Sequence, residues 1–119
     1  QIMSNKRKQK GDRFEREINE MFKRHGFDSK KVPLSGATWL KGDLITKIHG
    51  KTKTIECKVR AKGFKQIYEY LEGNDFVVAK SDRNVPLIIT RLNTDFFNLI
   101  KGAENGCNQQ LSSTEEESN

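Results

Sequence analysis

The spacing of apolar residues predicts a helix in the first quarter of the chain. Asp12 is placed to cap the start of this helix, and Gly26 is placed to end it. Residues 1–10 are polar and basic, and we expect them to form a loose arm ahead of the helix. The apolar positions recur at the intervals of a single helical face, at Phe14, Ile18, Met21 and Phe22.

A β-hairpin is predicted in the middle of the chain. The runs 44–48 and 53–59 are rich in strand-forming residues and are separated by a turn around Gly50. Residues 28–42 contain proline and two glycines, so we expect a loop there with a short strand near Val32.

The remaining pattern predicts a helix, two strands and a final helix. A second apolar stripe covers 64–71, strands are predicted at 75–79 and 86–90, and Asn93 or Thr94 is placed to cap a last short helix. The order is therefore helix, hairpin strands, helix, strands and helix. This order is typical of an α/β fold in which helices flank a central mixed β-sheet.

The length of 119 residues suits one domain, because single hydrophobic cores are usually built from about 100–150 residues. We place this domain at 11–101, after the basic arm. Residues 102–119 are polar and acidic, and we expect a flexible tail there.

Basic residues dominate the chain and point to a polyanionic partner. The formal net charge is +6, and all 22 Lys and Arg residues precede Gly102. Eight bases fall in the first 24 residues, a density that suits contacts with phosphates. The alternative is a solvated basic face without a partner. The eight are Lys6, Arg7, Lys8, Lys10, Arg13, Arg16, Lys23 and Arg24.

The cysteines and apolar runs indicate a cytoplasmic protein. Cys57 and Cys107 do not suggest a disulfide framework, and His25 and His49 stand alone, so no zinc site is indicated. We find no apolar run long enough to span a membrane and no signal peptide.

Two carboxylates and a lysine are predicted to meet at one end of the hairpin. Glu56 and Lys58 are two positions apart on a strand, so they share a face. Asp43 opens the neighbouring strand and can approach Glu56. Carboxylates of this kind bind Mg²⁺, which activates water and polarises a phosphate, and a nearby lysine stabilises the developing charge.

Glu15 adds a fourth candidate, on the flank of the apolar stripe of the first helix. In the alternative interpretation, Glu15 is an ordinary surface residue and the Glu56-x-Lys58 pattern is a solvated strand face. The combination of an acidic helix residue, Asp43 and Glu56-x-Lys58 in a strongly basic chain favours the catalytic interpretation.

This combination resembles the archaeal-type Holliday junction resolvases of the PD-(D/E)xK nuclease superfamily, including small phage-encoded forms. The resemblance covers roughly residues 8–92. The matching motifs are Lys10-Gly11-x-x-Phe14-Glu15-Arg16-Glu17, Gly42-Asp43-Leu44-Ile45 and Ile55-Glu56-Cys57-Lys58-Val59.

The resemblance implies a restriction-endonuclease-like core and a metal-dependent DNA endonuclease. It implies that Asp43, Glu56 and the main-chain carbonyl of Cys57 hold Mg²⁺ or Mn²⁺, with Glu15 as a further carboxylate at the metal and Lys58 as the catalytic lysine. It also implies a homodimer that cuts branched DNA, in the cytoplasm of a prokaryotic or phage-infected cell. Gly42 stands where the superfamily motif has proline, and Ser35 is the candidate for the serine of the loop that precedes the aspartate.

Further residues are candidates for DNA contacts. Trp39 could stack on an unpaired base, although it could equally cover the edge of the core. Gln66 and Tyr70 form a Gln-x-x-x-Tyr spacing that some nucleases of the superfamily place near the phosphate, with an ordinary surface pair as the alternative. The candidates are Lys6, Arg7, Lys8, Lys10, Arg13, Ser35, Trp39, Lys41, Arg60, Lys62 and Gln66.

Three functional hypotheses follow. The first is a structure-selective endonuclease for four-way or branched DNA. The second is a nicking or repair endonuclease of the same fold. The third is a basic nucleic-acid-binding module without catalysis, which predicts DNA binding that needs no metal.

Overall fold

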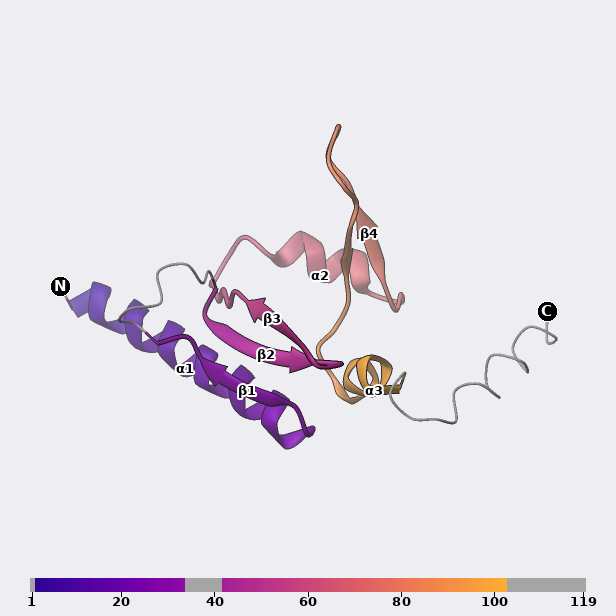
Figure 1. Cartoon of the computed structure of the whole chain (residues 1–119). Helices are drawn as coiled ribbons and strands as arrows, with labels where there is room; N and C mark the ends of the chain where they lie inside the picture. Colours follow the sequence, from indigo (N-terminus) through magenta and orange to yellow (C-terminus); the bar gives the residue numbers. More distant parts are fainter. Residues whose placement is uncertain (1, 34–41, 103–119) are drawn as a thin grey trace, which may run out of the picture. The chain divides into compact units, whose positions relative to one another are not determined.

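Three helices and five strands make up the part of the chain that the computed structural model describes, residues 2–33 and 42–102 (Figure 1). The chain divides into two units, one of residues 1–59 with 101–119 and one of residues 60–100. Within the described ranges, every helix is too short or too polar to traverse a lipid bilayer. The elements are α1 (Ile2–Arg24), β1 (Asp28–Lys31), β2 (Leu44–Ile48), β3 (Lys51–Ile55), α2 (Lys65–Leu71), β4 (Val77–Ala79), β5 (Leu87–Ile89) and α3 (Thr94–Gly102).

Helix α1 is longer than the apolar pattern predicts. It begins at Ile2, so it includes the segment 2–10 that was expected to be a loose arm, and Asp12 lies inside it. The prediction of an N-cap at Asp12 is therefore wrong. The physical reason is that Lys, Arg and Gln have good helix propensity without forming an apolar face, so periodicity alone does not detect this extension.

The C-terminal end of α1 confirms the prediction for Gly26. Gly26 has a φ of 91°. Its N–H donates to the Lys23 carbonyl at 3.0 Å, and the N–H of Phe27 donates to the Phe22 carbonyl, also at 3.0 Å. This pair of bonds is the Schellman motif, which needs a residue such as glycine in the left-handed region. The rings of Phe22 and Phe27 meet edge to face at 5.8 Å between centroids and close the motif.

The strands of the first unit form an antiparallel sheet in the order β1-β2-β3. His49 and Gly50 connect β2 to β3 with φ values of 53° and 75°, and positive φ at both central residues is what a type I′ hairpin turn requires. The predicted hairpin is thus confirmed, but β3 ends at Ile55 and not at residue 59. The first strand covers Asp28–Lys31, just before Val32.

A buried polar cluster joins α1 to the sheet. The Ser29 hydroxyl donates to Asn19 Oδ1 at 2.7 Å and lies 2.9 Å from Thr46 Oγ1. All three side chains are buried. Asn19 follows the core residue Ile18 in α1, and Thr46 lies two positions after the core residue Leu44 in β2. Because each polar atom has a partner, burial of these groups is tolerated. The short strand predicted near Val32 is thus present, although it lies at Asp28–Lys31, where the polar residues give no apolar alternation.

The second unit pairs its own two strands, β4 and β5, in antiparallel orientation. Asn93 Oδ1 accepts the Phe96 N–H at 3.1 Å, which confirms Asn93 as the N-cap of α3. The α/β class is also confirmed. However, the pairing in the described residues is antiparallel in two small sheets, where one mixed sheet was predicted. Short connections within each unit favour antiparallel neighbours, because parallel strands need a long crossover.

Candidate nuclease site

Asp43 lies immediately before β2, and its main-chain N–H and carbonyl each form a hydrogen bond. Its N–H donates to the Ile55 carbonyl at 2.7 Å, and its carbonyl accepts the Val32 N–H at 2.9 Å. The last residues paired at this end of β2 and β3 are Leu44 and Ile55. Asp43 precedes Leu44 and Glu56 follows Ile55, so these two residues lie at the same end of the β2–β3 hairpin, as the hairpin pattern predicts.

The conformation of Gly42 explains why this chain has no proline before Asp43. Gly42 has a φ of 100°, which the proline ring cannot adopt. A Cβ at this position would lie 3.1 Å from the Ile55 carbonyl oxygen and 3.3 Å from Thr54 Cβ. The backbone at Gly42 thus passes close to β3, and only glycine fits without strain.

The side chain of Asp43 fixes the segment that follows β3. Asp43 Oδ2 accepts the main-chain N–H of Cys57 at 2.7 Å. The ladder between β2 and β3 has already ended at Ile55, so a carboxylate takes the role that a main-chain carbonyl has within the sheet. This bond holds Glu56, Cys57 and Lys58 against the start of β2, although they lie outside the strand.

Three carboxylates from three segments act on the thiol of Cys57. Its burial, and then the negative charges of Asp43, Glu15 and Glu56, raise the pKa of the Cys57 thiol to about 11. Asp43 contacts Cys57 directly through the hydrogen bond to its main-chain N–H, and Glu56 precedes Cys57 in the sequence. Glu15, on α1, acts on the same thiol through its charge.

Glu15 is positioned by a contact with β1. Its Oε1 lies 3.3 Å from Lys31 Nζ, and its side chain is only 21% exposed. Lys31 was not among the candidates from sequence. Its contact with Glu15 depends on the pairing of β1 with β2, which places Lys31 opposite Leu44, at the end of β2 where Asp43 lies. Because β1 has no apolar alternation, the sequence did not predict this contact.

Glu56 and Lys58 form an ion pair on the surface. Lys58 Nζ lies 3.3 Å from Glu56 Oε2, and both side chains are more than half exposed. The contact agrees with the prediction that these two residues share a face. Because exposed ion pairs contribute little to stability, this pair is free to rearrange when a ligand arrives.

Residues 6–106 match the family model described as archaeal Holliday junction resolvase (Hjc). The chain belongs to this family. The Hjc family is part of the PD-(D/E)xK nuclease superfamily, as the sequence motifs indicated, and it comprises endonucleases that act on branched DNA. No curated protein and no solved structure matches the chain significantly.

The described side chains of this Hjc-family protein include no group of three or more His, Cys, Asp and Glu that is arranged to hold a metal ion. The donor set nevertheless suits Mg²⁺, which is usually held by one or two carboxylates together with water and substrate phosphate. Asp43 and Glu56 are two such carboxylates at the same end of the β2–β3 hairpin, and Asp43 accepts a hydrogen bond from the main chain of Cys57. The residues present therefore fit a hard divalent cation.

The candidate DNA-binding residues lie on both units. Arg60, Lys62 and Gln66 are exposed on the second unit, and Gln66 Nε2 donates to Glu69 Oε1 at 3.5 Å. Ser35, Trp39 and Lys41 lie outside the described residues. Five exposed bases lie along α1, at Lys6, Arg7, Lys8, Lys10 and Arg13.

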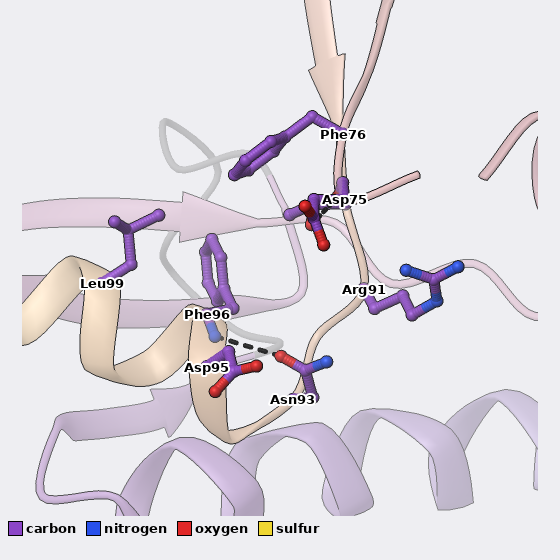
Figure 2. Close-up of a pocket in the computed structure, with 8 residues that line it drawn as sticks. Asp75, Phe76, Arg91, Asn93, Asp95, Phe96 and Leu99 are labelled. Carbon is purple, nitrogen blue, oxygen red and sulfur yellow. Dashed lines mark hydrogen bonds between the residues drawn. The ribbon is translucent and has the colours of Figure 1, made fainter. Parts of the chain in front are cut away.

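A pocket of about 230 Å³ in the second unit contains none of the predicted catalytic residues. Figure 2 shows Phe76, Phe96 and Leu99 on one side of it and the carboxylate of Asp75 close by. The dashed line there is the bond from the Phe96 N–H to Asn93 that caps α3. The pocket is therefore a feature separate from the residues that match the nuclease motifs.

Proposed function

We propose that this Hjc-family protein is a metal-dependent endonuclease that resolves four-way DNA junctions, with Mg²⁺ or Mn²⁺ as its cofactor. The observation that carries the proposal is the hydrogen bond from the Cys57 N–H to Asp43 Oδ2, which holds Asp43 beside the segment of Glu56 and Lys58, in a chain whose family acts on branched DNA. Carboxylates of this kind, with water and a substrate phosphate, are the ligands that Mg²⁺ prefers.

Asp43, Glu56 and the main-chain carbonyl of Cys57 would hold the ion, with Glu15 as a further carboxylate at the same place. When bound, the ion polarises the scissile phosphate and lowers the pKa of water. The hydrogen bond from the Cys57 N–H to Asp43 Oδ2 keeps one ligand carboxylate directed at the segment that carries the other ligands. This arrangement supports a site that exists before the metal arrives.

Lys58 would serve as the catalytic lysine. Its ammonium group lies 3.3 Å from Glu56 in the absence of DNA. A phosphate brought to Glu56 would meet this positive charge, which stabilises the negative charge that develops on the phosphate during cleavage. Lys58 and Glu56 are both more than half exposed, so a DNA strand can reach them.

We propose a homodimer as the active species, because resolution of a junction requires two cuts in separate strands. Apolar side chains on the β4–β5 hairpin support an association surface: Val78 and Ile88 are cross-strand partners on one face, and each is 67% exposed. A two-stranded hairpin is at best marginally stable without a covering surface. Sedimentation equilibrium tests this proposal, and a monomer at micromolar concentration would contradict it.

A panel of labelled DNA substrates tests the function. A synthetic four-way junction, and duplex, nicked and flapped DNA of the same sequences, would each be incubated with Mg²⁺, Mn²⁺ or EDTA. We expect paired symmetric cuts in the junction alone, and no cuts in EDTA. Cleavage of every substrate would replace the junction resolvase with a less selective nuclease. Tight binding without any cleavage would leave a nucleic-acid-binding module.

A further inference from the structure

Gly11 is an unexplained glycine in the middle of a long helix. It lies within the 23 residues of α1, where glycine is less favourable than alanine because the unfolded chain loses more conformational freedom. Its backbone has no positive φ, so the helix geometry does not require glycine. A different reason for its presence must therefore be sought.

The described part of the chain does not need the space beside Gly11. Among the described residues, a Cβ built at Gly11 would meet no atom within 4 Å beyond its chain neighbours and the backbone of its own helix. The contrast with Gly42 is direct, because a Cβ there would lie 3.1 Å from a main-chain oxygen of β3. No described residue therefore blocks a molecule that approaches Gly11 from outside.

The neighbours of Gly11 on the helix surface indicate what kind of molecule this is. Residues three and four positions apart are neighbours on a helix. Arg7 and Lys8 thus lie one turn before Gly11, with exposed side chains, and Glu15 lies one turn after it. The two bases attract an anion to the open backbone. The charge of Glu15 opposes it less, because Glu15 is paired with Lys31 at 3.3 Å.

We infer that the sugar–phosphate backbone of the DNA lies directly against α1 at Gly11, and that this close approach brings the neighbouring phosphate to the carboxylates at Cys57. The inference rests on the proposed function and names one place where the DNA is held. The stretch from Arg7 to Glu15 covers about 12 Å of helix axis, enough to follow more than one phosphate of a strand. A side chain at Gly11 separates the DNA from the helix and from Glu15.

The test replaces Gly11 with alanine and with leucine, in the full chain. Gln9 carries the same two replacements as a control, because it is exposed and lies two positions away, on a different side of the helix. Binding of a fluorescent four-way junction is measured by anisotropy in EDTA, so that no strand is cut. The melting temperature and the sedimentation behaviour of each variant are measured beside the Kd.

We expect Gly11→Ala to weaken junction binding by about tenfold, the equivalent of about 1.4 kcal/mol. Gly11→Leu should weaken it further, because the longer side chain holds the DNA farther away. The melting temperature should rise by about 2–5 °C in both variants, since both new residues favour a helix. The two Gln9 variants should bind like the unmodified protein.

Four results would overturn the inference. Unchanged binding would mean that nothing approaches Gly11 closely. Equal losses for alanine and leucine would indicate that glycine acts as a flexible joint. A lower melting temperature would mean that the protein itself fills the space, and dissociation of an oligomer would mean that a second copy does. If the unmodified protein does not bind the junction, the proposed function fails first, and this result is distinguishable from the other four.

Discussion

At the scale of single residues, Cys57 interacts with each of the three candidate carboxylate ligands. Its N–H is bound to Asp43, and its thiol experiences the charges of Asp43, Glu15 and Glu56. The thiol is not a ligand in our proposal, but it lies among the ligands. Its ionisation therefore reports on whether the carboxylates are gathered before any metal or DNA is added.

This gives a test of the position of Glu15. With a pKa of about 11, Cys57 is roughly one part in a thousand thiolate at pH 8, so its alkylation by iodoacetamide should be slow. Glu15→Gln removes a negative charge that opposes the thiolate, so the pKa falls and alkylation at pH 8 becomes faster. The measurement uses a Cys107→Ser background so that only one thiol reacts.

Glu17→Gln is the matched control, because Glu17 is exposed on the same helix and does not contribute to the raised pKa of Cys57. Its alkylation rate should equal that of the background protein. If Glu15→Gln leaves the rate unchanged as well, Glu15 does not face Cys57 and loses its place among the proposed ligands.

At the scale of elements, the buried cluster of Asn19, Ser29 and Thr46 fixes α1 on the sheet. Ser29 contacts both other side chains, and Glu15 lies one turn before Asn19 on the helix. On β1, Lys31 lies two positions after Ser29 and contacts Glu15. Two successive contacts between α1 and β1 thus set where Glu15 lies.

Ser29→Ala should lower the free energy of unfolding by about 1–3 kcal/mol, because Asn19 Oδ1 and Thr46 Oγ1 lose a buried partner. Denaturation in urea, followed by circular dichroism, measures the change. Ser81→Ala, at an exposed position between β4 and β5, should change stability by less than about 0.5 kcal/mol. Equal stability of the two variants would show that the cluster is not essential to the fold.

The sequence predicts elements well where local pattern determines them. The β2–β3 hairpin has strand-forming runs and a glycine turn, and Asn93 has the chemistry of an N-cap. The helix before Asp12 was missed, and the short strand predicted near Val32 was placed a few residues too late, because neither segment has an apolar periodicity. The alternation of Ile55, Cys57 and Val59 continues beyond β3, so the pattern extended this strand too far.

The same distinction applies to the candidate site. Asp43 and Glu56 lie at the same end of a local hairpin because of its register, and the sequence could predict this placement. Lys31 contacts Glu15 only because β1 pairs with β2 and α1 packs beside β1. Contacts of this kind depend on tertiary packing, and no pattern in a single sequence contains them.

At the scale of the whole molecule, we expect the positive charge of the chain to determine how the protein binds DNA. Without the four acids after residue 102, the chain has 22 Lys and Arg residues against 12 Asp and Glu residues, a formal charge of +10.

The match to the resolvase family covers residues 6–106 and so includes residues of both units. The boundaries predicted at 1–10, 11–101 and 102–119 stay a prediction.

Replacing Lys6, Arg7, Lys8 and Lys10 together with alanine should weaken junction binding and flatten its dependence on salt. Each phosphate contact that is lost reduces the slope of log K against log salt by about 0.9. Titrations at several salt concentrations measure this slope. Alanine at Lys80 and Arg83, exposed bases near the β4–β5 turn, should leave the slope unchanged. An unchanged slope in the fourfold variant would remove α1 from the DNA-binding surface.

We propose that Asp43, Glu56 and Lys58 form the site that cuts DNA junctions with a bound metal ion. To test this, cleavage and binding of one labelled four-way junction are compared, in Mg²⁺, for the unmodified protein and for Asp43→Asn, with Asp28→Asn as an exposed control. We expect Asp43→Asn to bind the junction normally and to cut it at less than about one hundredth of the normal rate. Asp28→Asn should cut normally. Cleavage by Asp43→Asn at the rate of the unmodified protein would mean that the catalytic site lies elsewhere.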